Sequence, residues 1–282
     1  MDRRFGALAL TALLLLSGCS FLGGAPGTGT PAPTTSPTPT ATATASPTAT
    51  PTASPTTTAA PLPDGYGPSG AENLSLALRT HRSALVASGS FTISYQASLL
   101  TGAGQASVSS VRTTNVTQAR GYEATNVSNG ATRERFLDDG TAYIRTDPAG
   151  GDVYYNRSSN AVYDPREYAA TGLIRPALEN VTYKNAERIE RGDRTFFRYR
   201  ASEVRNLQSL LGAGVDPSNV TSFDAAVVVA ADGSVQRVAY QATVDRGAEQ
   251  LAVQVRIDVV DQGGVDLGEP EWIDEARNAT EN

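Results

Sequence analysis

The stretch from Phe5 to Pro63 contains no charged side chain, and from Ala25 onward it is almost entirely proline, threonine, serine, alanine and glycine. The part after Gly24 has too little apolar surface to form a packed core. Proline spaced in this way favours extended conformations of roughly 3.1 Å per residue, so about forty residues reach on the order of 100 Å. Folding is therefore confined to residues 64–282, and the sequence predicts a stalk before them.

Residues 1–18 have the layout of a secretory signal peptide. Arg3 and Arg4 precede an apolar run from Phe5 to Leu16, which is too short to span a bilayer comfortably. The arginine pair is also compatible with twin-arginine export. The next motif, Leu-Ser-Gly-Cys, resembles the lipobox of bacterial and archaeal lipoproteins, whose cysteine is acylated. We predict that Cys19 is the lipid attachment site and that residues 19–63 form the tether. A buried structural cysteine is the alternative.

The composition limits how the domain after the tether can be stabilised and what it can bind. Cys19 is the only cysteine, so no intramolecular disulfide can form and residues 64–282 depend on their own core, as one domain of ordinary size can. The net charge is −6 and Lys184 is the only lysine. This composition fits a halophilic protein, and a GC-rich genome that favours arginine codons explains it equally well. No basic run indicates nucleic-acid binding.

The domain is expected to begin with an amphipathic helix. Leu74, Leu78, His81 and Leu85 recur at helical spacing, and Ser69 is the expected N-terminal cap. Two more helices are expected, over residues 165–180 and 202–211.

Alternation of apolar and polar residues predicts strands in several later segments, at residues 91–99, 223–229, 238–244 and 251–259. Three Gly-containing turns separate strand-like runs and predict hairpins, at residues 138–140, 231–233 and 245–247. The predicted fold class is α+β, with a long, largely antiparallel sheet and helices on one side.

In this chain, asparagine is often followed two residues later by serine or threonine. This spacing is the acceptor motif for N-glycosylation. Seven of the asparagines have this context: Asn73, Asn115, Asn126, Asn156, Asn180, Asn219 and Asn278. Roughly two would be expected by chance, so we expect glycosylation at some of them. The alternative is that polar faces of strands simply favour asparagine and threonine.

Residues suited to catalysis are scarce. His81 is the only histidine and lies on the apolar side of the first predicted helix, where a packing role is favoured over that of a base. Carboxylates remain as pairs in turns, where acids are normally just solvated: Asp138 with Asp139, Asp147 with Asp152, and Glu187 with Glu190. Their spacing does not match a known calcium loop. We expect no enzyme activity, no metal and no cofactor.

The best candidates for ligand binding lie in an aromatic-rich stretch. It includes Phe136, Tyr143 and Tyr154. Aromatic side chains with polar tips can line a pocket for an amphiphile. The same residues can instead fill an ordinary sheet core, and the sequence slightly favours that second interpretation.

The order of these elements is similar to that of a known family. A lipobox and spacer lead to a helix, a run of strands, Asp164-Pro165 before a helix, a strand pair around Gly192, and final hairpins around Gly233. Over about residues 72–275 this order resembles the mycobacterial lipoproteins LppX and LprG and, more distantly, the sorting proteins LolA and LolB. The resemblance implies a curved antiparallel half-barrel with helices across its concave face and space for acyl chains. It maps no binding residue onto this sequence.

Two functions from different classes follow. The favoured one is a non-catalytic lipoprotein anchored on the extracellular face of the cytoplasmic membrane, whose half-barrel binds a lipid or other hydrophobic ligand in a cavity. The alternative is a glycosylated structural or interaction module, with a filled core, that contacts other proteins of the cell envelope.

Overall fold

The computed structural model of the protein describes residues 61–212, 215–247 and 249–281. The predicted signal peptide, Cys19 and nearly all of the predicted tether lie outside the described residues. The elements, in chain order, are β1 (Tyr66–Gly67), β2 (Gly70–Ala71), α2 (Leu74–Ala87), β3 (Ser90–Thr101), β4 (Gly104–Asn115), β5 (Arg120–Val127), β6 (Thr132–Asp138), β7 (Thr141–Asp147), β8 (Tyr154–Ser159), η1 (Pro165–Ala169), α3 (Thr171–Asn180), β9 (Val181–Tyr183), β10 (Glu187–Arg191), β11 (Arg194–Val204), α4 (Leu207–Leu211), η2 (Pro217–Asn219), β12 (Val220–Ala230), β13 (Val235–Asp245), β14 (Gln250–Gln262) and α5 (Ile273–Thr280).

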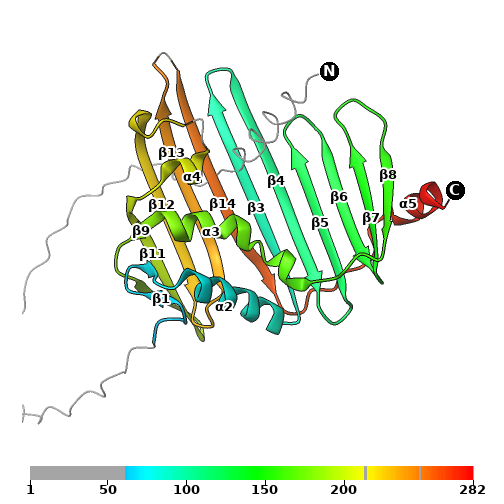
Figure 1. Cartoon of the computed structure of the whole chain (residues 1–282), viewed down its shortest axis with the longest axis horizontal. Coiled ribbons are helices and arrows are strands. Elements are labelled where there is room, and N and C mark those ends of the chain that lie inside the picture. The colour runs from blue at the N-terminus through cyan, green and yellow to red at the C-terminus, as the bar shows by residue number, and fades with distance from the viewer. Residues whose placement is uncertain (1–60, 213–214, 248, 282) are drawn as a thin grey trace, which may run out of the picture. The chain divides into compact units, whose positions relative to one another are not determined.

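One open antiparallel sheet dominates this α+β fold, as the sequence predicts (Figure 1). Its strands follow the order β10, β11, β12, β13, β14, β3, β4, β5, β6, β7, β8, and β9 pairs with the end of β11. Most neighbours are also consecutive in the chain. Along the main strand order the exception is β14 beside β3, which joins the last hairpin to the first long strand.

The three predicted hairpins are present. They connect β6 to β7, β12 to β13 and β13 to β14. In the first of them Asp139 and Gly140 both have positive φ, 43° and 69°. Two such residues in a row are what a two-residue turn needs to match the twist of its strands.

Helix α2 is present, but its predicted cap was wrong. The N-cap is Asn73, whose Oδ1 accepts a hydrogen bond of 3.0 Å from the backbone N–H of Leu76. Ser69 lies instead in the tight turn between β1 and β2, ahead of the helix. Both residue types cap helices well, so the sequence alone does not separate them.

The other two predicted helices differ from expectation in their extent. The first is divided into η1 and α3 by Ala170, whose φ of 50° interrupts helical geometry. The second shortens to α4, because Ser202 to Val204 continue strand β11 beside β9. Among the described residues, no helix has both the length and the apolar character needed to cross a bilayer.

The main core lies on the face of the sheet that carries Phe91 and Ile93, which we call the inner face. Helices α2, η1 and α3 cover this face over one half of the sheet (Figure 1). Leu85 of α2, Phe91 and Tyr199 are essentially inaccessible to solvent. A single continuous cluster of apolar side chains therefore fills the space between helices and sheet.

A second, smaller core lies on the opposite face, which we call the outer face. Strand register places Phe136 beside Tyr122, Tyr122 beside Thr113, and Thr113 beside Thr92, so Phe136 points away from the inner face. Helix α5 packs over Phe136 there. The sequence predicted helices on one side only. It missed α5 because this short, polar helix buries only Ile273 and Ala276.

Candidate functional site

The three aromatic residues selected from the sequence do not converge on one surface. Phe136 is fully buried in the second core. Its cross-strand neighbour Tyr143 packs beside it, with the guanidinium carbons of Arg157 and Arg277 at 5.9 and 6.0 Å from the ring centroid. Tyr154 lies on the inner face of β8 and is 51% exposed. The structure thus places two of them in packing and one at the surface.

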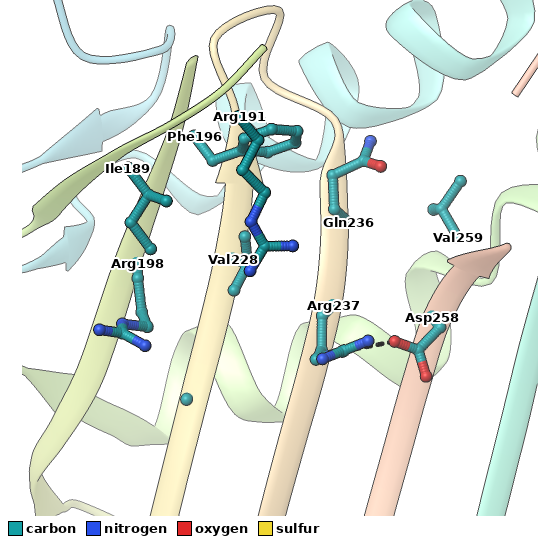
Figure 2. Close-up of a pocket in the computed structure, with 10 residues that line it drawn as sticks. Ile189, Arg191, Phe196, Arg198, Val228, Gln236, Arg237, Asp258 and Val259 are labelled. Carbon is teal, nitrogen blue, oxygen red and sulfur yellow. Dashed lines mark hydrogen bonds and ion pairs between the residues drawn. The ribbon is translucent and has the colours of Figure 1, made fainter. Parts of the chain in front are cut away.

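A groove crosses the outer face at the other end of the sheet, over strands β10 to β14 (Figure 2). Its volume is about 370 Å³, which lies within the range of small-molecule sites. Most of its lining side chains are apolar or arginine, and the lining residues are Ile189, Arg191, Phe196, Arg198, Ala226, Val228, Gln236, Arg237, Asp258 and Val259.

Strand pairing explains this mixed lining. Arg198 of β11 lies opposite Val228 of β12, which in turn lies opposite Arg237 of β13. One apolar side chain therefore sits between two guanidinium groups in a single cross-strand row. Two positions along β11, Phe196 lies opposite Ile189 of β10 and extends the apolar floor.

Carboxylates hold the two arginines of this row. Arg198 donates hydrogen bonds of 2.6 to 3.0 Å to both carboxylate oxygens of Glu187, and this pairing lowers the pKa of Glu187. Arg237 donates from Nε to Asp258 at 2.5 Å, and Arg256 binds the same carboxylate. These ion pairs fix the positions of the two guanidinium groups at the sides of the groove.

Arg191 differs from its neighbours. It lines the groove, and no ion pair is found for it within the described part of the chain (Figure 2). At the same end, the Arg194 guanidinium lies 5.1 Å from the centroid of the Phe196 ring. In a chain with a net charge of −6, this local excess of arginine favours an anionic ligand.

This groove was not predicted from the sequence, although one sequence signal for it is present. Phe196 and Phe197 are adjacent in a strand, so they must point to opposite faces. Phe197 is buried in the main core, and Phe196 is left on the outer face with Arg198. A pair of adjacent aromatic residues in an alternating strand thus marks an apolar spot outside the core.

His81 is a buried packing residue, as the sequence indicates. The backbone N–H of Val235 donates to its Nδ1 at 3.0 Å, so Nε2–H donates to the carbonyl oxygen of Ala169 at 2.9 Å. Burial lowers the pKa of His81 to about 4, although the bond to Ala169 opposes this shift. The ring is therefore neutral near pH 7, and both of its nitrogens are occupied.

The carboxylates that we expected in solvated turns are mostly paired with arginine, and Glu187 and Glu190 lie in strand β10 instead of in a turn. These pairs are Asp138 with Arg120, Asp147 with Arg145, Glu187 with Arg198, and Glu190 with Arg188. Asp139 and Asp152 are exposed. Within the described ranges, no three His, Cys, Asp or Glu side chains form a group that could hold a metal ion.

The sequon asparagines fall into two groups. Five are exposed, namely Asn73, Asn126, Asn156, Asn219 and Asn278. Asn115 and Asn180 are half-buried, and their Nδ2 groups donate to the carbonyl oxygens of Val265 and Pro176 at 2.9 and 3.0 Å. All seven lie outside the lining of the groove.

Comparison with known proteins identifies a family but no activity. The model of a family of unknown function, DUF7537, matches residues 4–276, and the chain belongs to this family. A search of curated proteins finds no match. Among solved structures, a domain from Vibrio parahaemolyticus named for outer membrane lipoprotein sorting is similar. It is 11% identical and covers 73% of this chain and 98% of its own, with a TM-score of 0.17. A TM-score this low establishes neither a shared fold nor a shared ligand.

Proposed function

For this member of DUF7537 we propose a non-catalytic, lipid-anchored protein of the cell envelope that binds an anionic amphiphile in the outer-face groove. The observation that carries the proposal is the row of Arg198, Val228 and Arg237, with Phe196 and Ile189 beside it. An apolar floor between cations suits a molecule that has both an alkyl chain and an acidic head.

The groove offers contacts to both parts of such a molecule. An alkyl chain lying on Phe196 and Val228 gains about 0.8 kcal/mol for each methylene group removed from water. An acidic head next to Arg191 forms a charge-assisted hydrogen bond, for which about 1.5–3 kcal/mol is typical. Neither contribution requires an existing ion pair to break.

The close packing of the inner face is a reason to place the ligand on the outer face. The resemblance to half-barrel carriers leads one to expect acyl chains between helices and sheet. In the structure, Leu85, Phe91 and Tyr199 belong to one buried apolar cluster in that space and are at most 1% exposed. The apolar surface of that half of the sheet is thus already used by the protein's own helices.

Ligand binding can be tested with the full-length protein in nonionic detergent and a fluorescent polyene fatty acid as the probe. We expect Val228→Glu to weaken binding at least about tenfold, because it places a carboxylate on the apolar floor. The matched control is Val111→Glu, which changes a valine that is 37% exposed on the outer face of β4, away from the groove. Equal binding by wild type and Val228→Glu would contradict the proposal.

A second pair of probes tests the anionic head. Arg191→Gln should weaken binding of the fatty acid about tenfold and leave binding of the corresponding fatty alcohol unchanged. If both probes lose the same affinity, the groove recognises only the alkyl chain, and the proposed preference for anions is wrong.

Export and anchoring are part of the proposal on the strength of the sequence. Removal of residues 1–18 and acylation of Cys19 would hold the protein on the extracellular face of the membrane. Cys19→Ser should release the protein into the medium or leave it unprocessed. Normal processing together with unchanged membrane association would contradict the assignment of Cys19.

A second candidate function, a glycosylated interaction module of the envelope, is favoured by the five exposed sequon asparagines. Intact-mass analysis with glycopeptide mapping of protein from its own cells would show glycans on the surface. We expect Asn126, Asn156 or Asn278 to be modified before Asn115 and Asn180, whose amide groups are already hydrogen-bonded. Absence of any glycan would remove the support for this candidate.

A further inference from the structure

A second pocket lies where helices α2 and α3 meet. Its volume is about 310 Å³, and it is lined by Ser75, Leu78, Arg79, Arg82, Thr171, Gly172 and Arg175. Three of these residues are arginines, two are hydroxyl-bearing, and none is a carboxylate. We propose that this pocket binds a phosphate group.

The fold brings the three arginines together from two helices. Arg79 and Arg82 are three residues apart on α2, so they emerge from the same side of that helix. Arg175 comes from α3. Between Arg79 and Arg82, the buried His81 ring bonds to the carbonyl of Ala169, just before α3 begins. This bond fixes the start of α3 against α2 and thereby fixes the shape of the pocket.

The positive charge of this cluster is poorly compensated by the protein. Arg175 contacts Glu179 at 3.8 Å, and both side chains are about half exposed, 51% and 50%, so this ion pair is weak. No ion pair of Arg79 or Arg82 is found among the residues that the structure describes. Like charges three or four residues apart destabilise a helix slightly, and a bound anion would offset that cost.

A phosphate group matches the donors that the pocket offers. It carries up to two negative charges and several acceptor oxygens, and guanidinium groups bind it in a bidentate manner. Ser75 and Thr171 add hydroxyl groups. Among the described residues, the first turn of α3 has neither a capping side chain nor an acidic residue. The inference rests on the three arginines. The backbone N–H groups in the first turn of α3 add further hydrogen-bond donors to the pocket.

This site is independent of the outer-face groove. Helices α2 and α3 cover the inner face, whereas the groove lies on the outer face of β10 to β14. No residue lines both. A failure of one proposal in the laboratory is therefore separable from a failure of the other.

The test is isothermal titration of inorganic phosphate into the full-length protein in nonionic detergent micelles. We expect saturable binding that Arg79→Gln combined with Arg82→Gln weakens at least about tenfold. The matched control is Arg133→Gln, an exposed arginine of β6 outside the pocket. Each variant's melting temperature is measured alongside, and Arg175→Gln provides a second pocket variant if the double variant does not fold.

Micelles doped with phosphatidic acid identify the source of the phosphate group. If this lipid suppresses binding of inorganic phosphate, whereas doping with neutral diacylglycerol does not, the pocket takes a lipid headgroup. If phosphate binding persists, the pocket takes free phosphate or a soluble phosphate ester. No saturable phosphate binding, or an equal loss in Arg133→Gln, would overturn the proposal.

Discussion

The two halves of the sheet carry their main apolar cores on opposite faces. In β11 to β14 and β3, the inner face is apolar and lies under α2, η1 and α3. In β5 to β8, the outer face carries the second core under α5, whereas the inner face carries charged residues such as Glu123 and Arg135 beside the buried Leu137. A continuous sheet can therefore change the side on which it is covered without breaking its hydrogen-bonded register.

Strand β4 is the place where the change occurs. Its inner-face residues include Ser110 and Arg112, and Arg112 forms an ion pair with Glu123 of β5 at 2.9 Å. Its outer-face residues include Ser109 and Thr113. Val108 of β4 is buried on the inner face in a small cluster with Ala97 of β3 and Val255 of β14, but the polar residues of β4 separate this cluster from the second core on the outer face.

The two cores are also held together differently. The main core consists chiefly of apolar side chains, whereas the second core depends on Glu134. This carboxylate accepts hydrogen bonds from Tyr122 at 2.5 Å, Arg145 at 2.7 Å and Trp272 Nε1 at 2.9 Å. Burial alone would raise the pKa of Glu134, but these three hydrogen bonds together lower it.

The largest expected effect belongs to the main core. Phe91→Ala should lower the free energy of unfolding of the whole domain by about 3–5 kcal/mol, because it empties a fully buried site. Urea unfolding measures this loss. Leu100→Ala, at an exposed position of the same strand, is the control and should change it by less than about 0.5 kcal/mol. A loss below about 1 kcal/mol for Phe91→Ala would show that the main core does not dominate stability.

The next largest effect is a pH dependence of the free energy of unfolding, which arises from His81 in the main core. Because the pKa of His81 falls from 6.5 to about 4 on folding, the unfolded chain takes up a proton first as the pH drops. The corresponding stability, about 3 kcal/mol, is fully present above pH 6.5 and is lost progressively as the pH falls towards 4.

Unfolding at pH 7 and at pH 4.5 measures this dependence. The control is His81→Gln, which keeps one donor and one acceptor but does not titrate, and which should lose less stability than wild type between the two pH values. Several carboxyl groups titrate near the lower pH in both proteins, so the difference between the proteins is the quantity of interest. The same loss in both would contradict the buried neutral state of His81.

A smaller and more local effect is expected in the second core. Glu134→Gln removes the charge that three donors share and should cost about 1–3 kcal/mol. Because Trp272 is the only tryptophan, its fluorescence should shift to longer wavelength as α5 loosens. Hydrogen exchange should quicken in residues 267–280 and stay slow in α2.

The control for this variant is Glu190→Gln, which changes an exposed glutamate that also bonds to arginine. It should alter neither the fluorescence nor the exchange of α5. If Glu134→Gln instead speeds exchange equally in α2 and α5, the two cores unfold as one unit, and the distinction between the two halves of the sheet is wrong.

Much of the fold was accessible from local sequence signals. The alternation from Phe91 to Leu99 gave a strand with its apolar side inward, and the Asp-Asp-Gly turn gave a hairpin. The face to which Phe136 points depends on register across four strands, and local alternation carries no information on that. The outer-face groove could not be predicted for a related reason. Arg198, Val228 and Arg237 become neighbours only through the pairing of β11, β12 and β13.

The most direct test of the proposed function is native mass spectrometry, with solvent extraction, on full-length protein isolated from the cells that make it. We predict an anionic amphiphile in stoichiometric amount on the wild-type protein and on Val111→Glu, and its absence from Val228→Glu. A folded wild-type protein that carries no such molecule, or a ligand retained equally by Val228→Glu, would contradict binding in the outer-face groove.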